Sequence, residues 1–324
     1  MSTFLKIASA VPFLIMLGPP APAETDLSGN WVTREHQDWQ ERGPGPEAVD
    51  YLGLPINAEA RAVALSYQAS LLSLPERQCL YYNQAYIAIG PFGLKMWSEV
   101  DPVTGKILAW KIGGVLDRAI LTIWMDGRPH PPNDAVHPFE GFTTGEWEGN
   151  VLTTYTTHFK TGYLRRNGVP LSDRTVMTAH FIRHGDFLTV TELIEDPVYL
   201  TEPFIVSRTW QLDPNTQLSQ LPPPCFPEAE VARLDGQSPI PHFLPGQNPY
   251  RNEMTKMYNI PEEAVMGGAE TMYPEYRRKL KDKYIAPVKC VRYCCGWEGT
   301  VAQSTLRDCI GRGFASPDEP QGRR

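Results

Sequence analysis

The feature of this sequence that most constrains its fold is a series of short β-type segments between about Tyr86 and Leu212. Tight-turn signals separate neighbouring segments at 101–105, 148–150 and 184–186, where Gly or Pro occupies the turn positions. Short strands joined by tight turns predict an antiparallel meander, which closes most simply into a barrel. No helix-length crossover interrupts the series, which argues against a parallel α/β sheet. We expect strands at 95–100, 106–112, 119–125, 142–147, 151–159, 175–183, 187–195 and 204–212.

The segments on either side of this series have a different character. Asn57 can cap a helix from Ala58 to about Leu72, because its side chain accepts from the free amides of a first turn. Beyond residue 213 the chain becomes rich in Pro, with two short helical patterns at 261–265 and 273–284. We therefore expect a barrel domain over 24–213. An irregular, disulfide-tied extension over 214–324 should wrap the barrel or form a small lid.

The first 23 residues have the pattern of a secretory signal peptide. Lys6 precedes an apolar run over 7–18, and Ala21-Pro22-Ala23 supplies small residues for cleavage. The apolar run is shorter than the roughly 20 residues that a membrane-spanning helix needs. The sequence thus predicts a soluble protein, secreted or exported to the bacterial periplasm, with no membrane span.

The chain has six cysteines, an even number, and in an oxidising compartment this favours disulfides. A zinc site is the alternative, but two of the cysteines are adjacent and no His follows His242, which suits paired zinc ligands poorly. We expect Cys79 to pair with Cys225 and so to tie the extension to the barrel. The six are Cys79, Cys225, Cys290, Cys294, Cys295 and Cys309.

Charge and missing motifs disfavour several classes of function. The formal net charge of −7 at pH 7 opposes binding to nucleic acid, which depends on Lys and Arg neutralising phosphates. The chain also lacks a Gly-x-Ser-x-Gly elbow, a Gly-x-Gly-x-x-Gly turn, a P-loop and a His-Glu-x-x-His helix. An ordinary serine hydrolase, a dinucleotide enzyme, a nucleotidase and a zincin are therefore not expected.

Gly29-Asn30-Trp31 lies just behind the predicted cleavage site, at the start of a first strand. This Gly-x-Trp resembles the opening motif of lipocalins and of the wider calycin barrels. In those folds the Trp closes the barrel floor and an Arg from the last strand stacks on it. The resemblance implies that Trp31 and Arg208 close this barrel, and that the barrel holds a small apolar molecule.

The densest polar cluster follows the strand expected at 119–125. Asp126, Arg128, His130 and His137 lie within twelve residues, among prolines that stiffen the segment. Such groups can supply a general acid, a general base and an anion clamp, and loops on rigid scaffolds often carry function. In the alternative interpretation, the Asp and Arg form a salt bridge that merely fixes the loop.

His158 ends a second candidate segment, the Thr-rich strand expected at 151–159. Strict alternation places His158 on one face with Thr154 and Thr156, and places Tyr155 and Thr157 on the other. Either face could line a polar cavity. A solvated outer face is the alternative, because Thr-rich faces are common on exposed strands.

Two further pairs of residues are candidates. Arg165 and Arg166 could clamp a carboxylate or a phosphate, or form a rim salt bridge with Asp173. His180 and Glu192 alternate with apolar residues on neighbouring strands, so they could meet as a buried acid–base pair or as a buried structural pair.

A metal bound by His130, His137 and His158 is another alternative. We disfavour it because the sequence offers no tightly spaced pair of ligands. Any chemistry is therefore expected to come from acid–base groups alone, with no metal and no cofactor.

Several short motifs lie in the block from Leu121 to Asp213. They are Met125-Asp126-Gly127-Arg128-Pro129-His130, Gly141-Phe142-Thr143-Thr144-Gly145-Glu146-Trp147-Glu148-Gly149, Arg165-Arg166-Asn167-Gly168 with Ser172-Asp173-Arg174, and Glu195-Asp196-Pro197. With these motifs the block resembles a widespread group of uncharacterised exported bacterial proteins. The resemblance implies a lipocalin-like barrel core and brings no established activity with it.

These observations predict a mainly β, antiparallel lipocalin-like barrel that binds a small hydrophobic or aromatic molecule. We expect a cofactor-free lyase, isomerase, hydratase or hydrolase in which His130 or His158 is the base and Asp126 orients it. Arg128 or Arg165 would then stabilise developing negative charge. The alternatives are a carrier of such a molecule and a structural partner of an envelope complex. The residues expected to line the cavity are Trp97, Trp110, Trp124, His137, Tyr155, His180 and Glu192.

Overall fold

The structure is a computed structural model that describes residues 25–34, 51, 53–66, 83–89, 93–114, 120–165, 167–219, 247, 255 and 260–281. The expected signal segment 1–23 lies outside these residues. So do all six cysteines and Arg166, and the predicted disulfides stay predictions.

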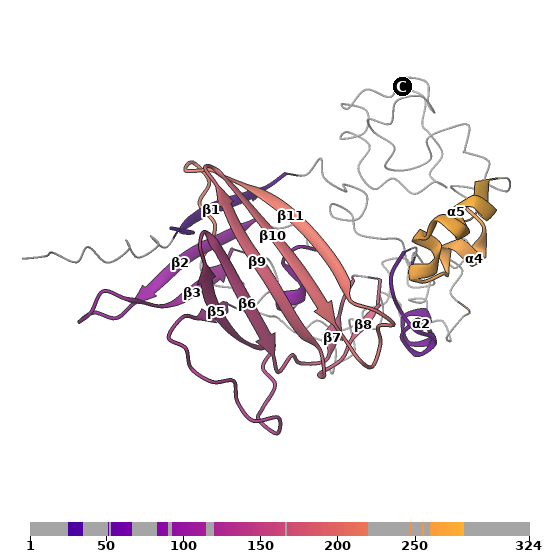
Figure 1. Ribbon diagram of the computed structural model, residues 1–324, viewed down its shortest axis with the longest axis horizontal. Helices are drawn as coiled ribbons and strands as arrows, with labels where there is room; N and C mark the ends of the chain where they lie inside the picture. Colours follow the sequence, from indigo (N-terminus) through magenta and orange to yellow (C-terminus); the bar gives the residue numbers. More distant parts are fainter. Residues whose placement is uncertain are drawn as a thin grey trace, which may run out of the picture.

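The described strands form one closed barrel of nine strands and a separate two-stranded hairpin (Figure 1). The barrel order is β1-β11-β10-β9-β6-β5-β4-β3-β2, and β1 closes the ring by pairing with both β11 and β2. The barrel strands are β1 (Gly29–Thr33), β2 (Leu94–Val100), β3 (Ile107–Gly113), β4 (Leu121–Trp124), β5 (Phe142–Glu148), β6 (Val151–Thr157), β9 (Val176–His184), β10 (Phe187–Glu195) and β11 (Phe204–Leu212). The hairpin consists of β7 (Gly162–Tyr163) and β8 (Pro170–Leu171).

The hairpins predicted from the turn signals are confirmed. β2 pairs with β3, β5 with β6, and β9 with β10, each in antiparallel register. The Gly residues of these turns, Gly105, Gly149 and Gly185, all have positive φ, a conformation that favours glycine. Alternation of apolar and polar residues along each strand then decides which side faces the core.

The prediction of a purely antiparallel barrel is wrong at one place, because β4 and β5 are parallel. Ile123 pairs with Thr143 and Trp124 with Thr144. Parallel neighbours need a long connection that carries the chain back to the starting end. Residues 125–141 provide it without a helix, which is why the absence of helical periodicity suggested no crossover. We call residues 125–141 the crossover loop.

The inside of the barrel is occupied by the protein itself. Large side chains such as Trp110, Phe181 and Trp210 are fully buried there. The short helix η3 (Gln84–Tyr86) is also buried: Gln84 donates from Nε2 to Thr143 Oγ1 (2.5 Å), and the Ala88 amide donates to Glu192 Oε1 (3.2 Å). Since β5 and β10 are not neighbours in the ring, residues 83–89 cross the interior between them.

Trp31 is fully buried, and its indole Nε1 donates to the carbonyl oxygen of Leu27 at 2.9 Å. The expected partner of its ring was Arg208. The guanidinium of Arg183 lies over the Trp31 ring, 5.3 Å from the centroid, and that of Arg208 lies over Trp210 at 5.4 Å. Trp31 is paired with Leu212, four residues beyond Arg208, and the stacking of Arg208 on Trp31 stays a prediction.

Apart from η3, the labelled helical segments lie at one end of the barrel (Figure 1). Asn57 caps α2 (Ala58–Leu65) as predicted, accepting from the Ala60 amide at 2.9 Å, but the helix is shorter than expected. Ile56 pairs with Leu200, next to β11. The helices α4 (Glu262–Val265), η5 (Ala269–Met272) and α5 (Pro274–Lys281) belong to the expected extension. The Tyr51 amide donates to Val265 O at 3.1 Å, which holds this part of the extension against the segment before α2.

None of the helices in the described parts of the chain is long and apolar enough to cross a membrane.

The turn between β10 and β11 is organised by the carboxylate of Asp196, which is 3% exposed. It accepts from the Ser172 amide (2.7 Å) and hydroxyl (2.8 Å), from the Thr175 hydroxyl (3.0 Å) and from the Val198 (2.9 Å) and Tyr199 (3.2 Å) amides.

We predict that Asp196→Ala lowers the free energy of unfolding by about 3 kcal/mol, because it leaves several buried donors without an acceptor. Urea unfolding monitored by circular dichroism measures the change. Asp173→Ala, which alters an exposed carboxylate in the same region, is the matched control and should change stability by less than about 0.5 kcal/mol. Equal effects of the two variants would contradict this role of Asp196.

Candidate functional site

The crossover loop lies against the outer wall of the barrel, next to β5 and the end of β6. The Lys160 amide donates to the Pro138 carbonyl at 3.2 Å, and His137 Nδ1 donates to the Phe159 carbonyl at 2.8 Å. The His130 ring packs edge-on against Phe142, with the ring centroids 5.0 Å apart. The loop thereby brings together three histidines that the sequence separates.

His130, His137 and His158 form one cluster centred on the hydroxyl of Thr157. Thr157 Oγ1 lies 2.7 Å from His130 Nδ1 and 2.7 Å from His158 Nδ1. His130 Nε2 lies 2.9 Å from Thr144 Oγ1, and His158 Nε2 lies 3.0 Å from the Pro132 carbonyl oxygen. The His137 and His158 rings are in contact, with centroids 5.0 Å apart. We call the chain from Thr144 through His130, Thr157 and His158 to Pro132 the histidine relay.

The carbonyl at the end of the histidine relay sets the direction of its hydrogen bonds when both rings are neutral. A carbonyl oxygen can only accept, so His158 donates from Nε2 and accepts at Nδ1. The Thr157 hydroxyl then donates to His158, and its oxygen accepts from His130 Nδ1. His130 therefore keeps its lone pair on Nε2, where the Thr144 hydroxyl donates to it. The network thus assigns both tautomers.

Protonation of His158 reverses this chain. Charged His158 donates from Nδ1 to Thr157, the Thr157 hydroxyl turns to donate to His130 Nδ1, and His130 then carries its proton on Nε2. In that state the nitrogen that faces Thr144 is no longer a base.

His158 reaches Thr157 because the chain leaves the regular strand at this point. β6 ends at Thr157, and the next residue, His158, has a positive φ of 57°. Among the residues that the structure describes, no other non-glycine residue has a positive φ. In a continued strand the two side chains would point to opposite faces. The left-handed conformation breaks the alternation, so His158 is 93% buried beside the crossover loop instead of facing the barrel interior.

The pKa of His130 lies below its ordinary value, first because burial disfavours the charged ring and second because of the charge of nearby His158. Its imidazole is therefore neutral at pH 7 and available as a base.

A surface pocket of about 330 Å³ adjoins the histidine relay on the outer wall of β5, β6 and β9. Thr144 belongs both to its lining and to the relay. Tyr155, which is 44% exposed, supplies an aromatic ring, and Arg128 and Glu146 supply opposite charges. The pocket lies on the outside of the barrel, whereas we expected the ligand inside.

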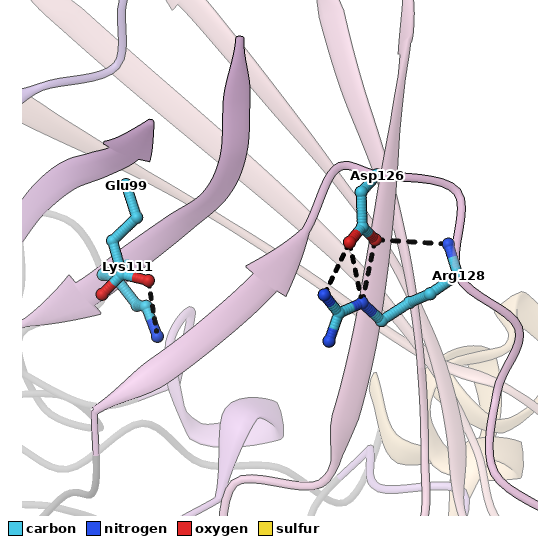
Figure 2. A network of polar contacts seen from close by, with 4 residues as sticks. All are labelled: Glu99, Lys111, Asp126 and Arg128. Carbon is cyan, nitrogen blue, oxygen red and sulfur yellow. Dashed lines mark hydrogen bonds and ion pairs between the residues drawn. The ribbon is translucent and has the colours of Figure 1, made fainter. Parts of the chain in front are cut away.

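Asp126 and Arg128 bind each other (Figure 2). The Arg128 Nε donates to Asp126 Oδ1 at 2.8 Å and its Nη2 to Oδ2 at 2.5 Å, while the guanidinium lies 3.5 Å from the centroid of the Trp124 ring. The expected role of Asp126 in orienting a histidine is wrong, because the nitrogens of His130 bond to threonines. The alternative interpretation, a salt bridge that fixes the loop, is the one observed.

Figure 2 also shows Glu99 on β2 and Lys111 on β3, whose charged groups lie 3.4 Å apart. The Lys111 Nζ is 5.3 Å from the Trp124 centroid. Two cations therefore lie near the Trp124 ring, and the guanidinium of Arg128 is the closer of the two.

The other residues expected to line a single cavity lie on different sides of the barrel wall, some inside the barrel and some outside it. His180 pairs with Thr191 and Glu192 with Ala179, so the expected His180–Glu192 couple is wrong, because the two side chains lie on opposite faces. Glu192 and Trp110 are buried inside. His180 is outside and bonds Thr153 Oγ1 at 3.0 Å.

Trp97 and Arg165 do not line the pocket either. Trp97 alternates with buried Met96 and is half-buried on the outer side of β2. Arg165 is 7% exposed and lies in the turn between β7 and β8, where its carbonyl accepts from the Gly168 amide at 3.2 Å.

Thr144 and Thr157 were not recognised from the sequence as site residues. The available signal was the placement of both hydroxyls on the outward side of paired strands: Thr144 lies opposite Tyr155, and Thr157 opposite Phe142. What concealed them was the assumption that β6 continues through His158, which would have put Thr157 and His158 on opposite faces.

The described residues contain no group of three His, Cys, Asp or Glu side chains that could hold a metal ion. In the histidine cluster, both ring nitrogens of His130 and of His158 already have hydrogen-bond partners.

The chain matches no protein-family model, and no curated protein or solved structure is detectably similar to it. The closed barrel is compatible with a lipocalin-like or calycin-like architecture.

We predict that His130 titrates below pH 6.5 in the folded protein, and that His158→Asn raises its pKa by removing a neighbouring positive charge. Asn tolerates the left-handed backbone of residue 158. Proton NMR of the imidazole Cε1–H signals measures both values. His184→Asn, at the exposed end of β9, is the control and should leave the pKa of His130 unchanged.

The same shift has a consequence for stability. Because the unfolded chain binds a proton at His130 more readily than the folded protein does, the contribution of this residue is fully present above pH 6.5. It decreases as the pH falls from there toward the pKa of the folded state. A His130 pKa at or above 6.5 would contradict the burial argument.

Proposed function

We propose that the protein is a cofactor-free enzyme that acts by general acid–base catalysis on a small aromatic or apolar molecule. The observation that carries this proposal is the histidine relay, in which the basic Nε2 of His130 contacts Thr144, a residue that lines the pocket. A catalytic base needs geometric reach, a suitable pKa and a fixed orientation. His130 has a lowered pKa and is held at both nitrogens.

The chemistry of the pocket supports a small ligand with an apolar part and a polar part. Tyr155 offers a half-exposed aromatic ring, while Thr144, Thr153 and Thr178 offer hydroxyls. Arg128 stands at the rim, preorganised by Asp126 and by Trp124. Pockets that combine an apolar surface with a few placed polar groups are typical of small-molecule sites.

The proposed site is on the outer wall of the barrel, under the crossover loop, and the interior is not part of it. Residues 83–89 cross the interior and bond to Thr143 and Glu192. A ligand inside would have to displace them. The export pattern of residues 1–23 supports a further proposal, that the enzyme acts in the periplasm or outside the cell.

To test this function, the mature protein is incubated with a mixed library of aromatic and apolar metabolites, and mass spectrometry identifies what is retained and what is changed. We expect a product whose rate of formation falls by about 10²-fold or more in His130→Gln, the usual contribution of a general base. His184→Gln, which changes an exposed histidine that is not part of the pocket lining, should retain the activity of the original protein.

Retention of an unchanged ligand that binds equally well to His130→Gln would overturn the enzyme proposal. That result would favour a carrier, which needs a pocket but no base.

A further inference from the structure

We infer that Thr144 is the nucleophile of this site and that the substrates are small carboxylic esters, so that the enzyme is a hydrolase with a covalent acyl-threonine intermediate. The inference rests on the proposed function, since it requires His130 to be a base. It adds a residue, a reaction class and a substrate class that the proposed function leaves open.

The first argument is the contact between Thr144 and His130. A nucleophilic hydroxyl is recognised by a hydrogen bond to a base that a third group orients in turn. Thr144 Oγ1 lies 2.9 Å from His130 Nε2, and Thr157 Oγ1 holds the opposite nitrogen at 2.7 Å. Triads of this kind are identified by geometry and by the roles of their members, not by order in the sequence.

The second argument is the direction of the hydrogen bond. With both rings neutral, the Pro132 carbonyl forces every hydrogen bond of the histidine relay to point one way. Thr144 then donates its proton to His130 Nε2, which leaves the lone pairs of its oxygen free for attack. The opposite tautomer of His130 would donate to Thr144 and could not activate it.

The third argument is position. Thr144, Thr153, Thr154 and Thr178 all line the pocket. Thr153 bonds His180 Nδ1 at 3.0 Å and Thr154 bonds the Ala179 carbonyl at 3.4 Å. Of the pocket-lining threonines, Thr144 is the one in contact with His130. Thr157 is enclosed between two imidazoles.

The reaction follows in two balanced steps. Thr144 Oγ1 attacks the carbonyl carbon of the ester and its proton passes to His130 Nε2; the C–O bond to the alcohol then breaks, and the alcohol leaves with that proton. Water attacks the acyl-threonine, gives a proton to His130 Nε2 and releases the carboxylic acid, while the proton returns to Thr144 Oγ1. No oxidant, reductant or further reactant is needed.

The pocket lining holds the carboxylates of Glu146 and Glu148 and one cation, Arg128, which can donate to the charge that such a step creates. The tetrahedral intermediate carries a negative oxygen, which preorganised donors stabilise. Arg128 lines the pocket, and its Nη1 has no hydrogen-bond partner among the described residues, while Nε and Nη2 bind Asp126. Tyr155 offers an aromatic surface, so an ester with a small acyl group and an aromatic alcohol matches the site.

The test uses p-nitrophenyl acetate as the probe with the full mature protein. We expect an initial burst of p-nitrophenolate and an acetyl group on the peptide that contains Thr144, identified by rapid acid quench and mass spectrometry. Thr144→Val, which keeps the shape of the side chain and the β-branch, should lose the adduct and about 10²-fold or more of the rate. Thr144→Ser, which keeps a hydroxyl, should retain both.

The matched control is Thr189→Val, the same substitution on the outer side of β10, where Thr189 bonds Thr209 at 3.0 Å. It should behave like the original protein. Ester turnover that needs His130 but persists in Thr144→Val without an adduct would overturn the nucleophile and leave His130 as a base. No ester turnover at all, alongside a His130-dependent product from the metabolite library, would overturn the ester class while the proposed function stands.

Discussion

The parallel pairing of β4 and β5 is the constraint on which the candidate site depends. Because Trp124 pairs with Thr144 in parallel register, the chain has to return along the barrel before β5 can begin. It does so on the outer wall, since the interior is already filled by buried side chains and by residues 83–89. An antiparallel connection here would have been a short turn, and His130 would have had no path to the hydroxyls of β5 and β6.

The second dependence is on a single backbone carbonyl. Pro132 O accepts from His158, and through Thr157 this fixes which nitrogen of His130 remains basic. The proline-rich composition of the crossover loop suits this role, because proline restricts its own φ and the conformation of the residue before it. The Asp126–Arg128 pair over Trp124 fixes the start of the same loop. Arg128 therefore belongs both to the contacts that hold the loop and to the lining of the pocket.

Much of the fold could be predicted because strand pairing through tight turns is a local property. Gly149 and Gly185 mark turns whose flanking strands pair as expected. Two errors came from non-local effects. The crossover was missed because 125–141 has no periodicity, and the couple of His180 with Glu192 failed because register, not composition, decides which face a residue occupies. Of the site, the three histidines and the loop that carries two of them were predictable, while the two threonines that bond to these histidines were not.

The sequence by itself determined the strand segments, the turns, the Asn57 cap and the concentration of polar groups around His130, because each follows from neighbours within a few residues. Only the tertiary structure decided that the barrel contains a parallel pair, that its interior is filled, and that the candidate site lies outside. It alone also placed Thr157 between His130 and His158, through one left-handed residue at the end of β6. The sequence could not give the direction of the hydrogen bonds, because that depends on which groups meet in space. It also could not place His158 beside Thr157, because the alternation of residues along a strand does not show where the strand ends.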